Sequence, residues 1–306
     1  MTQNLYLPQH WPAWFAIFLL RLVALLPLHW LLAIGRGIGW CSYHLLQRRR
    51  RIAEVNIRLC FPELSPEAQQ HLVRETMIAS VIGMLETAWS WWASDETLRK
   101  VVDYEGVELF RAAQASGRGI LLIGSHFTTL DLAGRLLRLE VDVDSSYQKQ
   151  SSPVFDHCIL QYRLKRFTNM VEKTEMRRLV KLVKSGRAMW YASDQDFGRK
   201  HSVFALFFGT PAATLNTLGS ILKLTGAKPL YFSHYRTGTG KNSRYLMRIT
   251  DPFGDQFSDD AVANATLLNR VIEEAIRKAP EQYLWVHRRF KTRPDPKGER
   301  FYEKRK

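Results

Sequence analysis

The segment 119–135 constrains the fold most, because it places polar residues directly after a buried strand. The apolar run 120–123 predicts a strand covered on both faces, and a helical pattern resumes at Leu130. His126 therefore lies on the connection between strand and helix, where α/β proteins place their chemistry. Asp131 falls in the first turn of the predicted helix, where the helix dipole favours a carboxylate. His126 and Asp131 form a candidate base and orienting acid, the alternative being an ordinary loop histidine.

Short apolar runs alternate with helical patterns from residue 104 onward. This alternation predicts an α/β fold with a mixed, largely parallel sheet and helices on both faces. We expect residues 207–214 to open a helix. This is either a plain helix start or one whose N-terminal amides receive a phosphate or carbonyl oxygen. The predicted strands cover 120–123, 141–147, 188–192, 229–234, 245–249 and 283–286. The predicted helices include 65–92 with its cap, 107–116, 153–166, 175–185, 214–224 and 259–278.

A second group of polar residues follows the predicted strand 188–192. Asp194 and Asp196 come directly after this strand, as His126 follows its own. The ends of parallel strands meet at one edge of a sheet, so we expect Asp194 to lie near His126. An Asp/Gly turn that ends at Gly198 is the alternative.

The N-terminal segment 11–34 is strongly apolar, and Arg21 is its only charged residue. Its 24 residues, as a helix, would extend about 36 Å, which is enough to cross a bilayer. The segment lacks the basic start and cleavage site of a secretory signal, so we expect it to be retained. The sequence thus predicts a membrane helix in an anchor, residues 1–46, followed by one domain over 47–306.

Positive charge follows this apolar segment, at Arg36 and at the four arginines of 48–51. By the positive-inside rule, these residues place the following domain on the cytoplasmic side of a membrane that the chain crosses once. Arg21 and Pro27 interrupt the apolar run, so a buried or interfacial amphipathic helix is the alternative.

The formal net charge of +15 predicts anionic partners. Most of the excess lies in two segments, 36–51 and 277–306. A phospholipid surface, an acidic protein or a nucleic acid would each fit this charge. No nucleic-acid reader motif is recognisable, and the apolar N-terminus favours a membrane, so we expect no nucleic acid as partner.

The chain carries no recognisable cofactor motif. It lacks a Walker sequence, and its Gly117-Arg118-Gly119 precedes a strand, whereas a dinucleotide fingerprint follows one. The three cysteines are widely spaced, and the histidines do not have a known metal-ligand spacing, so we expect neither a disulfide framework nor a metal. Ser125 lies outside a nucleophile elbow, which favours direct attack by a substrate hydroxyl over a covalent enzyme intermediate.

Several motifs occur in a fixed order along the chain. They are Asn56 with 60–63 (CFPE), His126-Phe127 with Asp131, Trp190-Tyr191 with 194–196 (DQD), Phe208-Gly209 with 212–214 (AAT), and 280–285 (PEQYLW) with 287–294 (HRRFKTRP). His-x4-Asp alone would arise by chance, whereas the long C-terminal block is specific. In this series the chain resembles the late acyltransferases of lipid A biosynthesis, the lauroyl and myristoyl transferases.

The resemblance implies a glycerolipid-acyltransferase-like α/β fold and an enzyme of the bacterial inner membrane. Its implied reaction is acyl transfer from acyl carrier protein to a hydroxyacyl chain of a Kdo-bearing lipid A precursor, without a cofactor. The resemblance implies that His126 is the general base, that Asp131 orients it, and that Arg163 and Asp194 lie beside them as substrate-binding residues. Many relatives have glutamate in place of Asp131, which changes the reach by one methylene.

The resemblance also gives the basic segments two partners, namely the phosphates of the lipid and the acidic carrier protein. Four residues could serve either partner, with a solvated basic face as the alternative: Arg288, Arg289, Lys291 and Arg293. A glycerophospholipid acyltransferase would use the same dyad on a smaller acceptor. A non-catalytic membrane adaptor would use only the basic ends and the apolar N-terminus.

Overall fold

We describe the protein from a computed structural model that covers residues 4–172, 174–254, 256–298 and 300–302. Residues 1–3 of the expected anchor lie outside these ranges, as do residues 299 and 303–306 of the basic C-terminal segment.

Five strands form the central sheet, and their parallel pairs confirm the predicted mixed, largely parallel α/β architecture. In spatial order they are β1 (Val102–Glu105), β9 (Arg244–Thr250), β8 (Lys228–Thr237), β2 (Ile120–Gly124) and β5 (Ala188–Ala192). The pairs β1–β9, β8–β2 and β2–β5 are parallel, whereas β8 and β9 are antiparallel. Strand β2 therefore has a parallel neighbour on each side.

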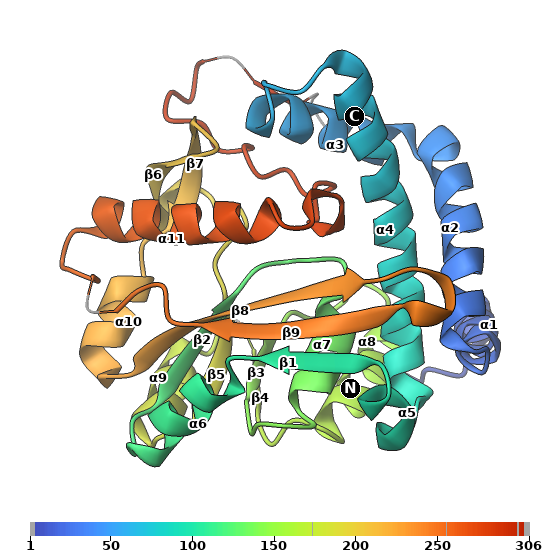
Figure 1. Ribbon diagram of the computed structural model, residues 1–306, viewed down its shortest axis with the longest axis horizontal. Coiled ribbons are helices and arrows are strands. Elements are labelled where there is room, and N and C mark those ends of the chain that lie inside the picture. The colour runs from blue at the N-terminus through green and yellow to red at the C-terminus, as the bar shows by residue number, and fades with distance from the viewer. Residues whose placement is uncertain (1–3, 173, 255, 299, 303–306) are drawn as a thin grey trace.

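Helices cover both faces of this sheet (Figure 1). Leu121 and Ile123 of β2 join one hydrophobic core, and Ile120 and Leu122 join a second core on the opposite face. A strand buried on both faces needs a continuous apolar run, which β2 has. The helices are α1 (Trp11–Ala24), α2 (Leu28–Leu45), α3 (Gln47–Cys60), α4 (Pro66–Trp92), α5 (Asp95–Arg99), α6 (Val107–Ala115), α7 (Leu130–Leu137), α8 (Pro153–Leu164), α9 (Met176–Lys184), α10 (Leu218–Thr225) and α11 (Ala261–Ile276).

The apolar N-terminal segment forms two helices, α1 and α2, which meet at Pro27. Proline has no backbone N–H to continue a helix, and here it caps the start of α2. Within the ranges described, none of the helices is long and apolar enough to cross a membrane. The single membrane-spanning helix expected over 11–34 is therefore not formed.

Both N-terminal helices pack against α4, which stands along one side of the sheet (Figure 1). Gly39 of α2 allows a close approach, since a Cβ atom there would lie 2.6 Å from the Cα of Ile78. Helix α4 begins where the sequence predicts, with the Ser65 hydroxyl accepting a hydrogen bond from the Ala68 N–H. The N-terminal segment is thus docked on the rest of the protein through α4.

Two local predictions in the C-terminal half are wrong. Residues 207–214 do not open a helix, because β6 (Ser202–Phe207) and β7 (Thr210–Leu215) form an antiparallel hairpin. The two residues between them, Phe208 and Gly209, both have positive φ, which is typical of a two-residue hairpin turn. The strand expected over 283–286 is reduced to one isolated bridge between Phe127 and Tyr283.

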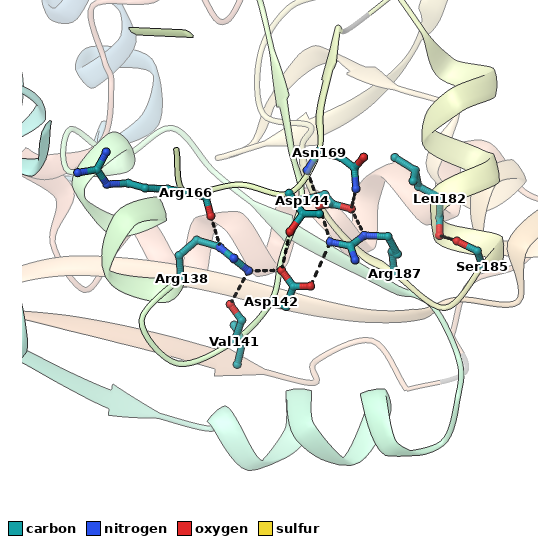
Figure 2. Close-up of polar contacts among 10 residues, drawn as sticks. Arg138, Val141, Asp142, Asp144, Arg166, Asn169, Leu182, Ser185 and Arg187 are labelled. Carbon is teal, nitrogen blue, oxygen red and sulfur yellow. Dashed lines mark hydrogen bonds and ion pairs between the residues drawn. The ribbon is translucent and has the colours of Figure 1, made fainter. Parts of the chain in front are cut away.

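A small parallel sheet of β3 (Ser145–Tyr147) and β4 (Met170–Glu172) extends the central sheet beyond β5. Strand β3 covers only the last three residues of the strand expected over 141–147. Figure 2 shows the buried Asp144 carboxylate, which accepts hydrogen bonds from Arg187 (2.7 Å) and from the backbone and side chain of Asn169 (both 3.0 Å). The carboxylate is satisfied by these donors, so it has a structural role away from the candidate site.

Candidate active site

The candidate site lies where β2 and β5 end side by side. The register pairs Gly124 with Ala192, so the residues that follow each strand emerge at the same edge. His126 donates its backbone N–H to Asp194 Oδ2 (2.8 Å), and its ring Nδ1 lies 2.6 Å from Asp194 Oδ1. The expectation that both residues meet at this edge is confirmed. An ionised carboxylate only accepts hydrogen bonds, so Nδ1 carries the proton and Nε2 is left free to accept one.

Electrostatics favour a charged pair at this position. Burial alone would lower the pKa of His126, but the charge of Asp194, its hydrogen bond and the charge of Asp131 together raise it. Burial would raise the pKa of Asp194, yet its interactions with His126 lower it to about 2. The Asp194 carboxylate is therefore ionised at neutral pH and stabilises a proton on the imidazole.

Asp131 makes a different contact from the one expected. Its carboxylate pairs with Arg163 of α8, which donates from Nε (3.1 Å) and, over a shorter contact, from Nη2. Asp131 lies in the first turn of α7, as the sequence predicts, but the hydrogen bond to the His126 ring belongs to Asp194. Asp131 acts on His126 through its charge alone. The structure thus brings all four candidate residues together. Asp194, rather than Asp131, contacts the imidazole ring, and Asp131 pairs with Arg163.

Segment 282–284 holds the loop that carries His126. The Thr128 N–H donates to the Gln282 carbonyl (2.7 Å), and the Leu284 N–H donates to the His126 carbonyl (3.0 Å). Gln282 is fixed in turn by Arg236, whose backbone N–H donates to its side-chain oxygen at 2.8 Å. These bonds connect the C-terminal block to the loop of His126, a contact that the motif alone does not reveal.

Two further histidines lie at the site and were not assigned a role from the sequence. The ring of His234 is fully buried and hydrogen-bonded to Thr129 (2.7 Å), and burial lowers its pKa to about 3. His287 lines a small cavity together with His126 and Asp194. Burial lowers the pKa of His287 to about 4, and its Nε2 accepts the Asp196 N–H at 3.4 Å. Both rings are neutral near pH 7 and shape the site without adding charge.

His126 is the ring that can exchange a proton with a substrate. Its side chain is 23% exposed, whereas the Asp194 side chain is inaccessible. A partly exposed imidazole backed by a buried carboxylate is suited to removing a proton from a hydroxyl group. Across the described ranges, no group of three or more His, Cys, Asp or Glu residues is arranged to hold a metal ion.

One of the four basic residues expected to face a partner is buried instead. The Arg289 guanidinium donates to the Ala213 carbonyl (2.6 Å) and to the Thr214 hydroxyl (2.9 Å), so it joins the C-terminal segment to β7. Asn56 holds the same segment from α3 by donating to the carbonyls of Trp285 (2.6 Å) and His287 (2.7 Å). Part of the basic C-terminal segment is therefore structural.

Comparison with known proteins shows the family of this chain. Residues 1–292 match the family model of bacterial lipid A biosynthesis acyltransferases. The chain is 34% identical over 289 residues to a lipid A biosynthesis lauroyltransferase of Escherichia coli K12, with 94% of each chain covered. It is 35% identical over 288 residues to the palmitoleoyltransferase of that strain, with 94% of this chain and 93% of the relative covered. This chain is an enzyme that belongs to the bacterial lipid A biosynthesis acyltransferase family.

Proposed function

We propose that the enzyme transfers an acyl chain from acyl carrier protein to a hydroxyacyl chain of a Kdo-bearing lipid A precursor. The observation that supports this most directly is the pair of His126 and Asp194, a partly exposed base on a buried carboxylate. The hydroxyl of the lipid-bound acyl chain is the group that such a base can activate.

His126 starts the reaction by removing the proton from the acceptor hydroxyl with its Nε2 atom. The alkoxide oxygen forms a bond to the thioester carbonyl carbon, and the carbonyl oxygen becomes an oxyanion. When the oxyanion collapses, the carbon–sulfur bond breaks, and the imidazolium returns its proton to the departing thiolate. The products are the new ester and the free thiol of the carrier, and His126 regains its starting form.

The acids and Arg163 support these steps. Asp194 stabilises the imidazolium, because its own low pKa keeps it ionised when His126 is protonated. Asp131 adds a second negative charge near the ring and holds Arg163 by an ion pair. Arg163, which is paired with Asp131, stabilises the oxyanion together with backbone amides.

We propose that the enzyme works at the cytoplasmic face of the bacterial inner membrane. Helices α1 and α2 expose many large apolar side chains, including Phe15, Phe18, Leu22, Trp30 and Trp40. An exposed apolar face favours insertion into the interface of a bilayer, and the arginines 48–51 that follow in α3 favour an anionic one. In this proposal residues 1–46 are an interfacial anchor, and residues 47–306 form the acyltransferase domain.

The proposal is tested by acyl transfer with purified protein. With acyl-loaded carrier protein and a lipid A precursor, wild-type enzyme should add one acyl chain, detected by mass spectrometry. His126→Ala should reduce transfer by roughly 10²–10⁴-fold, the usual contribution of a general base. Asp131→Ala should also impair transfer. A glycerophospholipid acceptor serves as the comparison; preferential transfer to it, or near-normal transfer by both variants, would refute the proposal.

A further inference from the structure

A second cavity, of about 540 Å³, lies in the C-terminal segment, lined by residues within 288–298 and 300–302 and by Arg199. Its size is within the usual range for a small-molecule site. Among the described residues that line it, five carry positive charge and one carries negative charge, which gives a formal balance of +4: Arg199, Arg288, Lys291, Arg293, Arg300 and Asp295. We call this cavity the basic pocket.

Neutral groups hold the cations of the basic pocket in place. The Arg293 guanidinium lies 4.0 Å over the Phe301 ring and donates to the Pro211 carbonyl (3.1 Å). Arg199 donates to the carbonyls of Arg293 (2.6 Å) and Pro294 (3.0 Å). Rings and carbonyls orient these side chains but do not cancel their charge. The pocket is therefore preorganised for an anion.

Among the residues that the structure describes, two carboxylates lie at the wall of the basic pocket, and both are already engaged. Asp295 accepts the Lys297 N–H of its own turn at 2.9 Å. Asp196, whose side chain is inaccessible, lies 3.9 Å from the Lys291 ammonium but accepts stronger bonds from the Thr292 N–H (2.6 Å) and hydroxyl (2.8 Å). Of the positive charge that the described lining residues carry, most is thus left for a ligand.

The basic pocket adjoins the candidate active site. Asp196 is joined to Thr292 in the pocket wall, and it follows Asp194, the partner of His126, by two residues. Segment 287–293 lines both cavities, with His287 and Arg289 on the His126 side and the remaining cations on the basic side. A ligand that spans both would place one anionic group in the pocket and its reacting group near His126.

We infer that the basic pocket binds a phosphate group on the sugar headgroup of the acceptor, an inference that rests on the proposed function. Arginine forks match the oxygens of a phosphate, and a phosphate monoester carries up to two negative charges. A carboxylate of an acidic carrier protein is a poorer match, because it carries a single negative charge and two oxygens. The pocket thus selects a phosphorylated glycolipid.

The test uses the full-length double variant Arg288→Gln, Lys291→Gln. The matched control is Arg177→Gln, Lys184→Gln on α9, where both residues are exposed. Binding is measured in detergent micelles without acyl donor, using the lipid A precursor and the same lipid with its phosphates removed. KM for the acceptor is then measured at saturating donor. Thermal unfolding of each variant shows whether the fold is retained.

We expect the double variant to bind the phosphorylated lipid about tenfold or more weakly, and to show a matching rise in KM. Its binding of the dephosphorylated lipid should equal that of wild type, which should itself bind that lipid more weakly than the phosphorylated one. The control should behave as wild type with both lipids.

Three results would overturn the inference. One is an equal loss of affinity for both lipids, which would show that the cations do not recognise phosphate. Another is a rise in KM for the acyl donor alone, which would assign the pocket to the carrier protein. The third is equal binding of the phosphorylated and the dephosphorylated lipid by the wild-type enzyme. Because the binding measurements need no turnover, they decide the inference even where acyl transfer itself fails.

Discussion

At the scale of single residues, two carboxylates act on His126 by different routes. Asp194 touches the ring and the backbone N–H, whereas Asp131 reaches the ring through its charge while bound to Arg163. The tautomer of the ring depends on Asp194, because that contact fixes the proton on Nδ1. Loss of the two acids should therefore have different kinetic consequences.

Asp194→Asn should change the pH profile of kcat/KM and lower its maximum. Only the neutral ring accepts a proton, so wild-type activity should rise with pH through the raised pKa of His126. Without the Asp194 charge, burial is the main influence on the pKa of His126 and lowers it. The acidic limb of the profile should therefore move to lower pH. The maximum should fall by roughly 10²-fold or more, because the ring is no longer held in one tautomer.

Asp131→Asn is the matched comparison. Its charge is the smallest of the three contributions that raise the pKa of His126, so the acidic limb should move less. A larger displacement with Asp131→Asn than with Asp194→Asn would assign the orienting role to Asp131, as the His-x4-Asp motif implies.

Sequence reasoning identified the members of the site but not all of their contacts. His126 and Asp194 each follow a buried apolar run, and parallel strands bring such positions together, so their proximity was predictable. The ion pair of Asp131 depends on where α8 packs, because Arg163 is 32 residues away in sequence. His287 reaches the site through a segment without regular structure, for which no periodic pattern exists.

At the scale of elements, α4 packs directly against the loop that carries His126 and Thr128. Gly83 lets the helix touch the loop, since a Cβ atom there would lie 2.2 Å from the Thr128 carbonyl oxygen. That carbonyl belongs to the backbone, which has few ways to move because the Thr128 N–H is bonded to Gln282. The distance between α4 and the loop thus fixes the position of His126.

Gly83→Ala should impair catalysis by displacing this loop. A shift of about 1 Å in a catalytic group commonly reduces the rate by roughly 10²-fold, and overpacking of this kind costs about 1–3 kcal/mol of stability. Gly37→Ala in α2 is the control, since a Cβ atom there has nothing within 4 Å. The control should keep full activity and gain up to about 1 kcal/mol. An unchanged kcat in the Gly83→Ala variant would show that α4 does not hold the His126 loop in its catalytic position.

Prediction of elements succeeded where the pattern was long and failed where it was short. Helix α4 and strand β5 occupy the predicted residues, because a capped helix and a continuous apolar run are strong local signals. The hairpin of β6 and β7 occupies residues that are expected to open a helix, and its small residues Ala212 and Ala213 would also suit one. Both are fully buried in a hairpin that packs against α11, and such burial depends on the whole fold.

At the scale of the whole molecule, apolar and basic surfaces gather on different elements. The exposed large apolar side chains lie mainly in the N-terminal segment 6–46, which includes α1 and α2, and the basic pocket lies in the C-terminal segment beside α3. Helix α4 lies between the sheet and the two N-terminal helices (Figure 1). This arrangement suits an enzyme that meets an anionic lipid at a bilayer surface and guides its headgroup to one side of the site.

The membrane proposal predicts that Phe15→Asp with Phe18→Asp abolishes most vesicle binding. These side chains are 61% and 54% exposed on α1, so their replacement should leave the fold intact. Each phenylalanine contributes about 1.5–3 kcal/mol on leaving water, so two charges in their place should weaken binding by roughly 10²-fold or more. Sedimentation with anionic phospholipid vesicles measures the effect.

Leu224→Asp is the control for that experiment, because Leu224 is 56% exposed on α10, an element distant in sequence from the apolar helices. It should bind vesicles as wild type does. With a water-soluble short-chain acceptor, the double phenylalanine variant should also retain wild-type kcat, since the His126 site is untouched. Equal vesicle binding by wild type, variant and control would show that α1 is not the surface that meets the bilayer, whereas loss of kcat on the soluble acceptor would show that α1 supports the site itself.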